Sequence, residues 1–202
     1  LIASEDIDPV YPVLRRLIVS PNVPQRGSES YLWLTFLYVA TYNLPSALFL
    51  WGLTNCTPQS ISPDRLRVPI GVERRGHRRP EALARHIEDY LDRAASYGGQ
   101  IPFLQSDWRP DNHEWNYLAF WTTCQQVWGN GRWATFKWAE ILRKVLDWPL
   151  YAPDMRLADC SGPRLGLIAL YGLPATTPID VLTPLGAQVR DFLTAELGLP
   201  LD

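Results

Sequence analysis

The sequence contains little cysteine, almost no lysine and no surplus of charge. Its three cysteines, Cys56, Cys124 and Cys160, lie far apart, and none forms a C-x-x-C pair or a cluster with histidine. The pattern gives no support for a zinc site or a cysteine-ligated cluster, and it favours reduced, buried thiols. The 19 basic and 21 acidic residues leave a net charge of −2, which argues against nucleic-acid binding through bulk charge alone.

Strand-like alternation is also scarce, and the sequence has no internal repeat and no low-complexity segment. The 202 residues, of which 47% are hydrophobic, exclude disorder and fibrous architectures and are enough to bury a substantial core. We therefore predict an all-α protein with a single domain over residues 1–202.

The longest apolar run, residues 31–51, approaches the roughly 20 residues that span a bilayer. Polar residues and Pro45 interrupt it, and no basic flank would orient it in a membrane. A buried helix, or a helix pair broken near Pro45, is the favoured interpretation.

Further helices are predicted from Pro80 to Gly98, over 111–128, from Arg132 to Pro149, over 164–171 and over 182–197. In the 111–128 segment, apolar spacing predicts that Trp115, Leu118, Ala119, Thr122 and Val127 point inward. In the helix that begins at Arg132, the predicted inward residues are Ala134, Trp138, Ile141, Leu142 and Val145.

Arginine provides all the basic residues except Lys137 and Lys144, and arginine contacts phosphate in a bidentate manner that lysine does not match. It concentrates in the irregular connection 56–80, at Arg65, Arg67, Arg74, Arg75, Arg78 and Arg79. Two interpretations stay open at this point: a solvated basic loop, or an arm that contacts DNA phosphates.

The most informative stretch is 129–154, GNGRWATFKWAEILRKVLDWPLYAPD. Gly129 and Gly131 form a tight turn between two predicted helices, and the second helix begins at Arg132. Unpaired N–H groups and the helix dipole make such a turn suited to a nucleic-acid phosphate. About two dozen residues later a Pro-Asp step places Asp154 after that helix.

This arrangement resembles the helix-hairpin-helix DNA glycosylase superfamily over residues of about 113 to 172. Gly129, Gly131, Arg132, Trp133 and Ala134 match the hairpin, and Asp154 stands where that family places its catalytic aspartate. The chain departs from the pattern because Asn130 replaces an apolar residue and Trp128 stands where proline is favoured. The four-cysteine cluster of some members is absent.

GRWATFKWAEIL and APDMRLADCSGPRLGL are more closely similar to the alpha-glutamyl/putrescinyl thymine pyrophosphorylase group. The resemblance implies a transferase that hypermodifies thymine in bacteriophage DNA. In this reaction an amine, from an amino acid or a polyamine, replaces the phosphorylated or pyrophosphorylated group on 5-hydroxymethyluracil. The implied substrate is double-stranded DNA, in the cytoplasm of the infected bacterial host and away from membranes. No resident cofactor or metal site is implied, and assistance by a divalent or monovalent cation stays open, as does the oligomeric state.

Asp154, Arg164 and Lys137 are the predicted catalytic residues. Asp154 would deprotonate or hold the attacking ammonium, and Arg164 with Lys137 would stabilise the departing charge. Gly129, Gly131, Arg132 and Arg156, with Arg74, Arg75, Arg78 and Arg79 of the arm, are predicted to contact phosphate or DNA. The structural alternatives are that Asp154 only ends a helix and that Lys137 and Arg132 lie on solvated faces.

Three other features leave alternatives open. Asp159 could share the role of Asp154 or pair with Arg156. Most of the nine tryptophans belong in a core, whereas Trp108 and Trp128, beside polar segments, could stack on a base. At the level of function, a DNA N-glycosylase is the second hypothesis and a noncatalytic DNA-binding module is the third.

Overall fold

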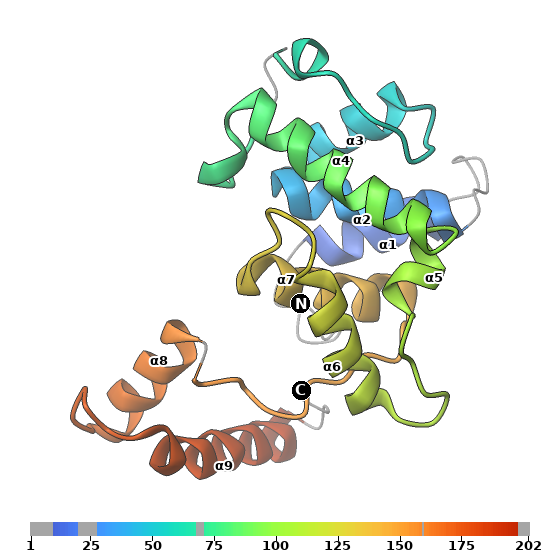
Figure 1. The fold of residues 1–202 in the computed structure, drawn as a ribbon. Coiled ribbons are helices and arrows are strands. Elements are labelled where there is room, and N and C mark those ends of the chain that lie inside the picture. Colours follow the sequence, from blue (N-terminus) through green and yellow to red (C-terminus); the bar gives the residue numbers. More distant parts are fainter. Residues whose placement is uncertain (1–9, 20–27, 68–70, 159, 198–202) are drawn as a thin grey trace. The chain divides into compact units, whose positions relative to one another are not determined.

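The structure is a computed structural model that describes residues 10–19, 28–67, 71–158 and 160–197, and Asp159 lies outside them. The described residues form helices joined by turns and loops and contain no strand, which confirms the all-α prediction (Figure 1). The chain divides into two compact units, Leu1–Leu150 and Tyr151–Asp202, and each is described by itself. The single domain over 1–202 stays a prediction.

The first unit contains seven of the described α-helices and two short 3-10 helices. In chain order they are α1 (Val10–Val19), α2 (Ser28–Thr41), α3 (Leu44–Leu53), η2 (Pro63–Leu66), η3 (Arg75–His77), α4 (Pro80–Ser96), α5 (Gln100–Leu104), α6 (His113–Cys124) and α7 (Arg132–Leu146). Within this unit α2 packs against α3, α4 and α7 (Figure 1).

The apolar run 31–51 forms two helices, as predicted. Tyr42 adopts a left-handed backbone conformation that ends α2, and the Asn43 side chain then caps α3 by accepting a hydrogen bond from the Ser46 N–H at 3.0 Å. Pro45 occupies the first turn of α3, where its missing N–H costs nothing. None of the helices in the described part of the chain combines the length and apolarity needed to cross a membrane.

Aromatic side chains from three helices form the centre of the first unit. Phe36 of α2 stacks on Tyr90 of α4 with ring centroids 3.9 Å apart, and Trp138 of α7 meets Tyr90 edge-on at 5.4 Å. The Trp138 indole donates to the Thr35 hydroxyl at 3.0 Å, so its polar atom is satisfied in the interior. This packing fixes the direction of α7, the helix that begins at the glycine turn.

The predicted inward face is confirmed for α7 and wrong for α6. In α7 all five predicted residues are buried. In α6 the buried residues are Asn116, Tyr117, Phe120, Trp121, Thr123 and Cys124. Leu118 and Thr122, predicted to point inward, are exposed, although Val127 is buried as predicted. The apolar residues of α6 are spread around the helix, so its periodicity left the inward face undetermined.

The second unit contains α8 (Ser161–Tyr171) and α9 (Ile179–Leu197), which pack against each other. Leu157, Leu167 and Leu182 form its buried centre. A Cβ at Gly186 would lie 2.6 Å from the Met155 sulfur, so a larger residue there would displace the Met155 side chain. The predicted helices 164–171 and 182–197 correspond to α8 and α9.

Candidate nucleic-acid interface

The glycine turn joins α6 to α7 as predicted. Gly129 has φ +92°, a conformation that favours glycine, whereas Gly131 has φ −77° and is the N-cap of α7. The first N–H groups of a helix have no intrahelical acceptor, and here they follow an exposed glycine with open space around its Cα. This end of α7 has the geometry for binding an anion.

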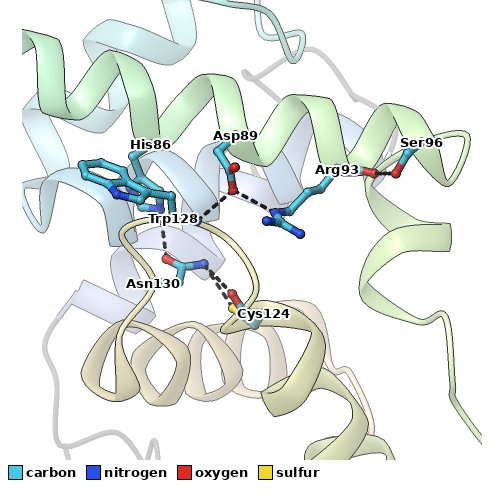
Figure 2. A network of polar contacts seen from close by, with 7 residues as sticks. All are labelled: His86, Asp89, Arg93, Ser96, Cys124, Trp128 and Asn130. Atoms are coloured by element: carbon cyan, nitrogen blue, oxygen red, sulfur yellow. Dashed lines mark hydrogen bonds and ion pairs between the residues drawn. The ribbon is translucent and has the colours of Figure 1, made fainter.

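Asn130, between the two glycines, points into the protein and fastens the turn (Figure 2). Its Nδ2 donates to the Cys124 carbonyl at 3.3 Å and contacts the Cys124 sulfur at 3.2 Å, and its Oδ1 accepts from His86 Nε2 at 3.0 Å. Because the amide oxygen can only accept, His86 carries its proton on Nε2. Burial, with smaller contributions from the positive charges of His77 and Arg74, holds the pKa of His86 well below its usual range.

Arg74 and His77 support the same turn from the arm. The Arg74 guanidinium donates to the carbonyls of Gly129 at 2.5 Å and Val39 at 3.3 Å, and burial lowers its pKa to about 10. His77 donates from Nδ1 to the Ala40 carbonyl at 2.8 Å. Burial, followed by the charge of Arg74, lowers the pKa of His77 to about 4, so this ring is neutral at pH 7.

Trp128 and Asp89 join the turn to α4. The Trp128 N–H donates to Asp89 Oδ2 at 2.8 Å, and the same oxygen accepts from Arg93 at 2.8 Å (Figure 2). Burial alone would raise the pKa of Asp89, but these two hydrogen bonds and the charges of Arg93 and Arg85 together outweigh burial and lower it. Proline has no N–H, so tryptophan at this position supplies a hydrogen bond that the usual residue cannot.

The remaining arginines of the arm lie on the surface. Arg75, Arg78 and Arg79 are exposed, and Arg78 donates to the Val72 carbonyl at 3.3 Å. Arg132 is exposed in the first turn of α7. The structure therefore divides the four arginines predicted to contact DNA in the arm, because Arg74 holds the turn while the side chains of Arg75, Arg78 and Arg79 are exposed.

Lys137 lies one turn into α7 and is mostly buried. Its Nζ lies 2.9 Å from Glu140 Oε2 and 3.2 Å from the Tyr11 hydroxyl, which itself donates to Glu140 at 2.6 Å. These contacts join α1 to α7, and the catalytic role predicted for Lys137 stays a prediction.

Asp154, Arg156 and Arg164 all belong to the second unit. Asp154 is exposed, and its Oδ1 accepts a hydrogen bond from the Arg156 N–H at 2.7 Å. Arg156 is half-buried with φ +46°, and the turn at Asp154 accommodates this conformation. Arg164 is half-buried in the first turn of α8. The roles predicted for these three residues stay predictions.

Sequence reasoning missed His86, Asn130 and Asp89 as a group. In the sequence, His86 and Asp89 belong to a helix pattern, and Asn130 is only a departure from the glycosylase motif. A usable signal exists, since a polar residue between two glycines requires a partner when the turn packs on a core. The partner residue, 44 positions earlier in the chain, is not deducible from local spacing.

The model of the amino acid:DNA transferase family matches residues 65–198, which are 134 of the 202 residues. The chain belongs to this family. It is a transferase that joins an amino acid to DNA, in the hypermodification of thymine in bacteriophages, and the resemblance seen in the sequence is confirmed. No curated protein and no solved structure matches the chain.

The matched region of this amino acid:DNA transferase includes the arm from Arg65, the glycine turn and the segment that carries Asp154 and Arg164. DNA is its substrate, and the amino acid is the donor class that the family implies. Among the described residues no group of histidine, cysteine, aspartate and glutamate is placed to hold a metal ion.

The two glycines of the turn are expected to respond differently to substitution. Gly129→Ala should lower the free energy of unfolding by about 2 kcal/mol, because alanine is strained at this φ. In addition, its Cβ would lie 2.9 Å from His77 Nε2 and 3.0 Å from the His86 ring. Urea unfolding measures the loss. Gly131→Ala is the matched control, with nothing within 4 Å of its Cβ, and equal losses in the two variants would contradict this account of the turn.

The neutral histidines predict a pH dependence of stability. The folded pKa of His77, about 4, is below the ordinary histidine value of 6.5, so the unfolded chain binds more protons between these values. The contribution of His77 to stability should therefore decrease as the pH falls from about 6.5 to about 4, by up to about 1.4 kcal/mol per pH unit. The lowered pKa of His86 acts in the same direction.

The measurement is urea unfolding at several pH values for the wild type and for His77→Asn, which keeps a donor near the Ala40 carbonyl. Between pH values of about 4 and 6.5, the free energy of unfolding of the variant should depend less steeply on pH, by the equivalent of about one proton taken up on unfolding. Identical slopes would show that His77 does not titrate in this way.

Proposed function

We propose that the transferase acts on duplex DNA, in the cytoplasm of the infected host, at a thymine-derived base that carries an activated 5-hydroxymethyl group. The amino group of the amino acid attacks the exocyclic methylene and forms a C–N bond. The C–O bond to the phosphate or pyrophosphate breaks, and its electron pair leaves with that oxygen. The ammonium proton of the donor is released, so the products are an aminomethyl base, the phosphate or pyrophosphate and a proton.

The observation that supports DNA binding at the turn is its two-sided construction. Asn130 and the carbonyl of Gly129 are bonded within the protein, while Gly131, Arg132 and Trp133 at the start of α7 are exposed. In this proposal a DNA phosphate binds the exposed side. The exposed guanidinium groups of Arg75, Arg78, Arg79 and Arg132 add charge contacts along the backbone.

The second unit is proposed to carry the chemistry. Asp154 offers an accessible carboxylate that attracts the donor ammonium and accepts its proton during attack. Arg164 and Arg156 offer guanidinium groups for the leaving phosphate, whose charge increases as the C–O bond breaks. Cleavage of a glycosidic bond releases no phosphate, so guanidinium groups that bind a leaving phosphate suit the transfer better than base excision.

The proposal is tested with DNA containing a phosphorylated or pyrophosphorylated 5-hydroxymethyluracil and a mixture of amino acids and polyamines. Digestion to nucleosides and mass spectrometry should show the mass of an added amino acid for the wild type. Asp154→Asn should reduce the rate by about 100-fold or more, a magnitude typical of a positioned proton acceptor, and should still bind the DNA.

Arg164→Ala should likewise reduce the rate far more than the DNA affinity. Asp180→Asn and Arg190→Ala, both exposed on α9, are the matched controls. Abasic sites in the product would assign the glycosylase reaction instead, and unchanged nucleosides with retained binding would leave only a DNA-binding module.

The arm is tested through the salt dependence of DNA binding. Replacing Arg75, Arg78 and Arg79 by glutamine should flatten the slope of log K against log salt by about 0.9 for each phosphate that the protein no longer neutralises. The binding constants can be measured by fluorescence anisotropy at several salt concentrations, with Arg16→Gln, exposed on α1, as control. An unchanged slope would show that the arm does not contact phosphates and is a solvated basic loop.

A further inference from the structure

The two tryptophans proposed from sequence to stack on a base are engaged within the protein. Trp128 lies between the His77 ring at 6.2 Å and the Arg85 guanidinium at 4.4 Å. Trp108 meets Trp148 edge-on at 5.1 Å. All nine tryptophans belong to the described residues, and Trp133 is the only one of them that is exposed, with 44% of its surface accessible.

Trp133 follows Arg132 in the first turn of α7, two residues after Gly131. Its ring makes a T-shaped contact with Tyr42, with centroids 4.6 Å apart and planes 86° from parallel, and the Arg74 guanidinium lies 5.9 Å from its centroid. One turn further along α7, Phe136 is 43% exposed. Arg74 thus contacts both the Gly129 carbonyl and the Trp133 ring, so one side chain positions the turn and the ring together.

The first turn of α7 around this ring carries the exposed cation Arg132, and the sequence has no acidic residue between Glu114 and Glu140. The ring itself cannot bind a phosphate, because the face of an indole is electron-rich, but it can stack on a nucleobase. A transferase that reaches an exocyclic carbon of a base also has to disturb base stacking, and an aromatic platform compensates for this disturbance.

We propose that Trp133, supported by Tyr42 and Arg74, is a stacking platform for an unstacked base next to the phosphate bound at the glycine turn. This inference rests on the proposed function, because it requires DNA at that turn. It adds a base-contacting residue to a site otherwise made of phosphate contacts. It also assigns a use to an exposed tryptophan whose burial would otherwise stabilise the fold.

The test compares two duplexes of the same sequence, one fully paired and one with a single unpaired thymine. Trp133→Ala should bind the second duplex about tenfold more weakly than the wild type, within the range for one stacked base, and the paired duplex less than about threefold more weakly. Trp133→Phe should recover most of the difference. Phe49→Ala, which removes an aromatic side chain of α3 that is 47% exposed, is the matched control.

A second readout reports stacking directly. With 2-aminopurine in place of the unpaired base, wild-type protein should quench the fluorescence and Trp133→Ala should not. Equal reductions of affinity for both duplexes, or quenching unchanged in the variant, would overturn the inference and leave DNA binding at the turn intact. Failure of the wild type to bind either duplex would overturn the proposed function together with this inference.

Discussion

The hydrogen bond between His86 and Asn130 determines how the glycine turn is presented. It holds Asn130 in the interior, with Oδ1 at 3.0 Å from the imidazole. The amide group of the same asparagine donates to the Cys124 carbonyl and so attaches the turn to the end of α6. With Asn130 fixed between them, the two glycines have different roles. Gly129 brings its carbonyl to Arg74, and Gly131 leaves the start of α7 open.

The imidazoles below the turn are uncharged because of burial and nearby charge, and the bond to Asn130 acts in the opposite direction by raising the pKa of His86. A protonated His86 would place a second charge beside His77 and Arg74 in a buried site, which burial and mutual repulsion both disfavour. Arg74 keeps its charge there, bonded to two carbonyls. In the proposed function, the attraction for DNA comes from the surface arginines and the start of α7.

The net charge of −2 is compatible with a DNA-modifying enzyme because of where the charges lie. Asp89, one of the acids on α4, accepts hydrogen bonds from Arg93 and from the Trp128 N–H, and so helps to hold the glycine turn against α4. Arg75, Arg78 and Arg79 of the arm, with Arg132, remain on the surface of the first unit. In the proposed function, such a distribution limits nonspecific binding and leaves exposed arginines of the first unit to contact DNA.

The sequence by itself determined the all-α class, the break near Pro45, the inward face of α7, the glycine turn and the family, because each depends on local spacing or a contiguous motif. The tertiary structure decided the rest. It showed that Trp133, not Trp128, is the exposed tryptophan at the turn, and that Asn130 finds its partner on α4. It also corrected the buried face of α6 and gave Arg74 and Lys137 protein partners. These outcomes depend on which helices meet, and residues far apart in the chain make those contacts, so no local pattern encodes them.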